Sequence, residues 1–93
     1  MSKEIEFIAR GVIVSRGRIL LCHTKGKRNT YLPGGHIEFN EPAGDALKRE
    51  IREELGCDSR IVRFLGAVEH SYGSGEKTTA EINLIFEVRA SSL

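Results

Sequence analysis

The sequence predicts an α+β fold with a mixed β-sheet, and three patterns along the chain support this class. Apolar and polar residues alternate from Thr79 to Val88, as in a strand that buries one face. Residues 43–55 repeat their apolar side chains at the spacing of an amphipathic helix. Other apolar runs lie on both sides of this helix, so the order is strands, helix, strands. The chain has 93 residues, and we expect a single domain over residues 1–93.

The first part of the chain predicts a hairpin followed by a basic loop. Glu6 to Ser15 alternates loosely and leads into a turn that contains Gly17. Ile19 to Cys22 is a short apolar run, which we expect to be a buried strand. The segment from His23 to Thr30 is basic and broken by a glycine, so it predicts a loop. Tyr31 and Leu32 follow as a short strand.

The part after the helix predicts two more strands. Gly56 is placed to cap the C-terminus of the helix. Ser59 to Glu69 carries the apolar residues of a strand, and Ser71 to Thr78 is a flexible turn rich in Gly and Ser. The alternating segment from Thr79 to Val88 is the last strand.

Composition excludes several classes of protein. Lysine and arginine total 14 against 13 acidic residues, a net charge of +1, so we expect no bulk nucleic-acid partner. No apolar run approaches the roughly 18 residues of a membrane span, and residues 1–6 do not have the pattern of a signal peptide. We therefore expect a cytoplasmic protein with no membrane partner. Cys22 and Cys57 lack the spacing of a zinc site and are predicted to be buried thiols.

Three glutamates on the predicted helix point to a metal site. Glu50, Glu53 and Glu54 are spaced i, i+3 and i+4, so they meet on one side of the helix. Like charges so placed repel unless a cation lies between them, and hard carboxylate oxygens suit Mg²⁺, with Mn²⁺ as the alternative. A solvated acidic face is the simpler explanation. It is disfavoured because the glutamates border the apolar stripe of Leu47, Ile51 and Leu55.

The segment before the helix suits close contact between backbone and ligand. Pro33 fixes one backbone angle, and Gly34 and Gly35 leave room for a bound group. Five residues separate Gly35 from Glu41, and seven more lead to the run Arg49-Glu50-Ile51-x-Glu53-Glu54-x-Gly56-Cys57. From Gly35 to Cys57 this arrangement resembles the signature box of the Nudix hydrolases. It departs at Cys57, where the family usually has a larger aliphatic residue, and at Asn40, where Gly is common.

The resemblance implies a Nudix fold, a mixed sheet between helices with the box as a loop-helix-loop on one side. Family members usually continue past the strand that matches Thr79 to Val88, with further strand and a second helix. The resemblance therefore implies either that this sequence is C-terminally truncated or that a partner subunit covers the second face of the sheet. We expect a homodimer on this basis.

The resemblance also implies roles for the residues of the box. Cleaving a phosphoric anhydride requires neutralising a diphosphate and placing a water in line with a phosphorus. Metal held by the three glutamates, with the backbone carbonyl of Gly34 as a further ligand, would serve both needs. Arg49 would orient the glutamates, paired with Glu41 or Glu38, while Gly35 and Gly56 are structural. The general base stays open among Glu53, Glu54 and a group in a later loop.

A second set of residues predicts weaker substrate contacts. Lys25 and Arg28 in the basic loop could reach the phosphates of a substrate held near Gly34, although loop cations are solvated by default. Tyr31 could stack on a base. His36 lies inside the box at a variable position and could touch substrate, but a loop histidine is more often simply exposed.

The expected function is that of a Mg²⁺-dependent hydrolase. Its predicted substrate is a small nucleotide-type molecule in which a nucleoside diphosphate is linked to another group, such as a nucleoside triphosphate, ADP-ribose or a nucleotide sugar. The residues of the box do not choose among these, because the family recognises the base elsewhere. The alternative is a non-catalytic module of the same fold that binds a nucleotide or a sugar phosphate.

Overall fold

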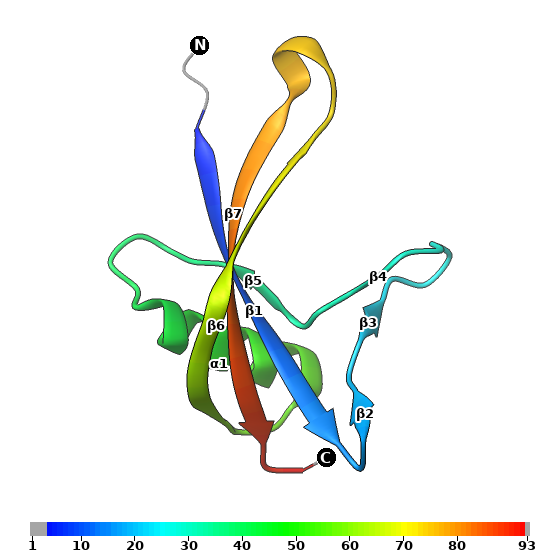
Figure 1. Cartoon of the computed structure of the whole chain (residues 1–93), viewed down its shortest axis with the longest axis vertical. Helices are drawn as coiled ribbons and strands as arrows, with labels where there is room; N and C mark the ends of the chain where they lie inside the picture. Colours follow the sequence, from blue (N-terminus) through cyan, green and yellow to red (C-terminus); the bar gives the residue numbers. More distant parts are fainter. Residues whose placement is uncertain (1–3, 93) are drawn as a thin grey trace.

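A mixed β-sheet forms the centre of the computed structural model, which describes residues 4–92 (Figure 1). Its strands are β1 (Ile5–Ser15), β2 (Arg18–Ile19), β6 (Ser59–Tyr72) and β7 (Thr79–Ala90), in the order β2-β1-β7-β6. A further strand, β5 (Gly34–His36), pairs with β1. The neighbours β1 and β7 are parallel, whereas the other pairs are antiparallel. The predicted α+β class with a mixed sheet is confirmed.

The helix α1 (Ala43–Leu55) has the bounds that the sequence predicts. It begins after Pro42, whose extended backbone allows the chain to turn into the helix. It ends at Gly56, whose left-handed φ of 70° suits glycine and whose N–H donates to the Arg52 carbonyl at 2.9 Å. Asp45 in the first turn and Arg52 in the last turn match the helix dipole.

The core lies between α1 and one face of the sheet. Leu47 and Ile51 of the helix are fully buried, and they pack on β1 and β7. Gly11 allows this close approach, because a Cβ there would lie 3.3 Å from Val88 Cγ2 and 3.6 Å from Ile51 Cδ1. The buried cluster consists of Ala9, Ile13, Leu47, Ile51, Cys57 and Val88. The sheet thus holds α1 in a fixed position above β1.

The predicted N-terminal hairpin is present, but the apolar run from Ile19 to Cys22 is only partly buried, with Leu20 packed against the core. Val14 pairs with Ile19 across the turn, yet 48% of Ile19 and 46% of Leu21 are exposed. The reason is that β2 has only two residues, and the chain then leaves the sheet. Cys22–His23 (β3) pairs instead with Thr30–Tyr31 (β4) in a separate two-stranded ribbon, which Figure 1 shows apart from the main sheet.

Two further predictions of local structure need correction. The segment expected to be a loop before the helix contains β5, because the backbone of Gly34 and Gly35 pairs with β1. Strand β6 continues to Tyr72, beyond the predicted end, and the turn that follows contains a 3₁₀ helix, η1 (Gly75–Lys77). Asn40 has the left-handed φ of 62° expected where the family has Gly.

The face of the sheet opposite α1 is hollowed. Val12, Val14 and Leu65 line a cavity of about 440 Å³ there, together with the Arg63–Glu87 ion pair at 2.6 Å. The homodimer expected to cover this face stays a prediction.

Among the described residues, α1 and η1 are both too short to span a membrane as a helix. The prediction that residues 1–6 are not a signal peptide falls partly outside the described residues, because these begin at residue 4. Leu93 also lies outside them.

Candidate active site

Two glycines of β5 bring the backbone against the acidic side of α1. Gly35 has no room for a side chain, because a Cβ there would lie 2.5 Å from the carboxyl carbon of Glu50. At Gly34 the φ of 144° favours glycine, and a Cβ would lie 2.0 Å from the Ala9 carbonyl oxygen. The N–H of Gly34 lies 3.4 Å from Glu54 Oε2. The carboxylates of Glu50 and Glu54 therefore both lie beside this glycine pair.

Arg49 is the centre of the site's polar network. Its Nε donates to Glu41 Oε2 at 2.8 Å and its Nη2 to Glu41 Oε1 at 3.0 Å, a bidentate pair. Its Nη1 donates to Glu50 Oε1 at 3.0 Å and lies 3.6 Å from Glu53 Oε1. Nη2 also donates to the His36 carbonyl at 3.2 Å. One guanidinium thus links the loop to the helix and fixes the Glu50 carboxylate.

The predicted partners of Arg49 differ in how closely they approach. Glu41 is the close one, and its Oε1 also accepts the backbone N–H of Glu38 at 3.1 Å. The side chain of Glu38 is mostly exposed and lies 3.9 Å from Arg49. The Arg49 guanidinium, with that backbone N–H, lowers the pKa of Glu41 to about 2. Glu41 in turn raises the pKa of Arg49, so this pair stays charged.

Glu54 lies in a different environment from Glu41. Burial raises its pKa, and the negative charge of Glu50 adds to this rise. The Cys22 thiol lies 3.7 Å from Glu54 Oε2, within reach to donate a hydrogen bond. Burial, followed by the charge of Glu54, raises the pKa of Cys22. Cys57 is buried as predicted, whereas Cys22 is only partly buried and contacts a site glutamate.

The donor set of this site fits a hard divalent cation. Across residues 4–92, no three His, Cys, Asp or Glu side chains already form a metal-binding cluster. However, Glu50 and Glu54 lie close enough for one charge to raise the pKa of the other. Glu53, with 60% of its side chain exposed, projects from the same helix beside Arg49. Carboxylate oxygens with backbone carbonyls nearby are the ligands that Mg²⁺ and Mn²⁺ prefer.

Residues 6–92 match the sequence profile of the NUDIX domain. The chain belongs to the NUDIX domain family. A relative from Danio rerio, 8-oxo-dGDP phosphatase NUDT18, is 35% identical over an alignment 98 residues long, gaps included, that covers 87% of this chain and 30% of that protein. RNA pyrophosphohydrolase from Halorhodospira halophila is 41% identical over 59 residues, covering 61% of this chain and 33% of that protein. The NUDIX domain described here thus spans about a third of the length of these curated relatives.

Solved structures agree with this assignment. A MutT NUDIX hydrolase from Burkholderia pseudomallei is 28% identical, with a TM-score of 0.74 over 91% of this chain and 68% of that one. A NUDIX hydrolase from Nitrosomonas europaea has a TM-score of 0.78 at 20% identity, over 97% of this chain and 62% of that one. The second likeness concerns the fold alone.

The residues predicted to touch substrate lie in different settings. Lys25 and Arg28 are exposed in the loop between β3 and β4 of the NUDIX domain. Tyr31 is on β4, with its ring beside the Arg10 guanidinium. The His36 ring pairs with Glu6 at 2.9 Å, while its carbonyl accepts from Arg49. No local pattern in the sequence indicates the contacts of Cys22 and Arg10 in this region, because both depend on the path of the folded chain.

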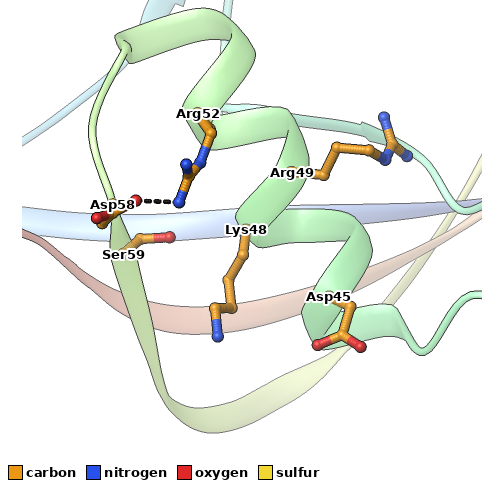
Figure 2. A pocket seen from close by; sticks show the side chains of 6 residues that line it. All are labelled: Asp45, Lys48, Arg49, Arg52, Asp58 and Ser59. Atoms are coloured by element: carbon orange, nitrogen blue, oxygen red, sulfur yellow. Dashed lines mark hydrogen bonds and ion pairs between the residues drawn. The ribbon is translucent and has the colours of Figure 1, made fainter.

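A hollow of about 380 Å³ lies on another side of α1 and does not include the glutamates of the site. Figure 2 shows Lys48 and Arg52 beside it, with Arg52 paired to Asp58, and the Arg49 side chain pointing away from them. Its lining residues are Asp45, Lys48, Arg49, Arg52, Asp58 and Ser59. Arg49 borders this hollow, but its hydrogen-bonded partners Glu41 and Glu50 do not, so the candidate site around Arg49, Gly34 and Gly35 faces another side of the helix.

Proposed function

We propose that this NUDIX domain is a Mg²⁺-dependent pyrophosphohydrolase. Its substrates are nucleoside diphosphates linked to another group, namely nucleoside triphosphates, ADP-ribose or nucleotide sugars. The observation that carries the proposal is the Arg49 network, which holds Glu50 against Gly35 while Glu54 lies beside Gly34. The pyrophosphohydrolase and phosphatase names of the relatives support the same class of reaction.

Each residue of the site has a role in this proposal. Glu50, Glu53 and Glu54, with the carbonyl of Gly34, would hold the cation, which would neutralise the diphosphate and acidify a water when bound. Arg49 positions the carboxylates, because its bidentate pair with Glu41 leaves Nη1 directed at Glu50. Either Glu53 or Glu54 accepts the proton of the attacking water. Gly34 and Gly35 let β5 pack directly against the Ala9 backbone and the Glu50 carboxylate, because a Cβ at either position would collide with these groups.

The test is a substrate panel with a matched pair of variants. Nucleoside triphosphates, ADP-ribose, dinucleotides and nucleotide sugars are incubated with and without Mg²⁺, and release of monophosphate or pyrophosphate is followed. Glu53→Gln removes a proposed ligand, whereas Glu76→Gln makes the same change at an exposed position in η1. We expect Mg²⁺-dependent hydrolysis that is lost only in Glu53→Gln.

Two other results would overturn the proposal. Equal hydrolysis by the parent and Glu53→Gln would refute the assignment of the site. Metal-dependent binding of a panel member by folded protein, with no turnover of any member, would instead establish the non-catalytic binding module.

A further inference from the structure

Arg10 is a second arginine close to the proposed site, and it comes from the sheet instead of the helix. In the register of β1 and β5 it lies opposite Gly34. Its Nη1 donates to the Leu32 carbonyl at 3.0 Å. Its Cζ lies 5.7 Å from the centroid of the Tyr31 ring, a distance at which a cation is attracted to the ring face. Two contacts from one segment therefore hold this guanidinium in place.

No carboxylate of the described residues forms an ion pair with Arg10. Within the described range 4–92, Arg10 forms no ion pair, whereas Arg49 forms ion pairs with four glutamates. Its charge nevertheless reaches the site, because it opposes the rise in the pKa of both Glu54 and Cys22. Arg10 is thus a partly buried cation opposite Gly34, whose N–H lies 3.4 Å from Glu54 Oε2.

This arrangement leaves donors for an anion. An arginine has five N–H groups, and one of them is occupied by the Leu32 carbonyl. A guanidinium that is already held in one orientation binds phosphate oxygens with little further loss of side-chain freedom. Phosphoryl transfer needs positive charge around the oxygens of the diphosphate. The carboxylates of α1 provide none of this charge, and Arg49 is engaged with them.

We propose that Arg10 is a phosphate-binding residue, whose guanidinium, held by Leu32 and Tyr31, contacts an oxygen of the substrate diphosphate beside Gly34 and Glu54. This inference rests on the proposed function for its substrate class. The competing explanation is structural, since the bond to Leu32 also anchors the segment before β5.

The experiment separates charge from anchoring. Binding of inorganic pyrophosphate in the presence of Mg²⁺ is measured by calorimetry for the parent, Arg10→Lys, Arg10→Gln and Tyr31→Leu. Arg18→Gln is the matched control, because Arg18 is an exposed arginine of the hairpin. Loss of a charged hydrogen bond predicts affinity about 10- to 100-fold weaker in Arg10→Gln, with a smaller loss in Arg10→Lys and none in Arg18→Gln. For any hydrolysed substrate, KM rises more than kcat falls.

The outcomes distinguish this inference from the proposed function. Pyrophosphate binding in Arg10→Gln equal to that of the parent, even with a lower melting temperature, would show a structural role and overturn it. If Arg10→Gln does not fold, Arg10→Lys and Tyr31→Leu provide the same comparison. Arg10-dependent binding without turnover of any substrate would support the inference and refute the enzyme. Hydrolysis by the parent without weaker binding in the variants would leave the enzyme intact and refute the inference.

Discussion

The two sides of α1 differ in what they contribute to the molecule. On one side Ala46, Leu47 and Ile51 are fully buried against the sheet. On the other side Glu50 keeps 18% of its side chain exposed and Glu53 keeps 60%. Glu50 and Ile51 are adjacent in sequence, yet Glu50 belongs to the candidate site and Ile51 belongs to the core. Because the two roles are on different sides of one helix, substitutions should change activity and stability separately.

The largest expected effect is on the site side. Glu53→Gln should lower kcat by about a thousandfold or more, because it removes a charged ligand and retains the shape of the side chain. Its melting temperature without metal should be unchanged or higher, since like charges on the helix are reduced. Rates are measured at saturating Mg²⁺, and melting in EDTA. A lower melting temperature with unchanged kcat would mean that Glu53 stabilises the fold and does not belong to the site.

The strongest effect on the buried side is expected at Leu47. Leu47→Ala should lower the free energy of unfolding by about 2 to 5 kcal/mol, because it removes a fully buried side chain and leaves a cavity. Leu21→Ala is the control, since Leu21 is nearly half exposed. Urea unfolding measures both. Similar losses in the two variants would mean that α1 is not packed as described.

Substitution of Arg49 tests whether its ion pairs serve the candidate site or the stability of the fold. Arg49→Ala should reduce kcat/KM by about 10- to 100-fold while lowering the melting temperature by only a few degrees, because its partners lie on the site side. Arg52→Ala is the control, since its pair with Asp58 is exposed. A large loss of melting temperature without metal would mark Arg49 as a structural ion pair.

Metal binding should stabilise the parent protein through the glutamates of α1 that are proposed as ligands. Mg²⁺ at 100 times its dissociation constant should add about 2.7 kcal/mol to the free energy of unfolding. Glu53→Gln should lose most of this gain, whereas Glu76→Gln should keep it. Thermal melting with Mg²⁺ and with EDTA gives the difference. Equal stabilisation of both variants would place the cation elsewhere.

The smallest effect is a dependence of stability on pH. The pKa of Glu41 is lowered from 4.5 to about 2, so its pair with Arg49 stabilises the fold fully above pH 4.5. This contribution is lost as the pH falls toward 2, because the folded protein then has to take up the proton. The difference in free energy of unfolding between the parent and Glu41→Gln should shrink over this range. A difference that is constant with pH would contradict the bidentate pair.

The sequence predicted the features that depend on local pattern. The helix bounds follow from the apolar spacing and Gly56, and the last strand follows from its alternation. The run from Ile19 to Cys22 was misjudged because apolar composition does not show that the chain leaves the sheet after two residues. The contact between Cys22 and Glu54 joins residues 32 positions apart, and no local signal reports it.

The parallel pairing of β1 with β7 has a consequence for biosynthesis. Ile5 lies opposite Ala80 and Ile13 opposite Val88, so two strands separated by most of the described residues are neighbours in the centre of the sheet. While the ribosome is still making the middle of the chain, β1 and α1 have no central partner for their apolar faces. Closing a loop of this length precedes any gain from the contact. We therefore expect the domain to fold only once β7 has emerged, with the earlier segments exposed to chaperones until then.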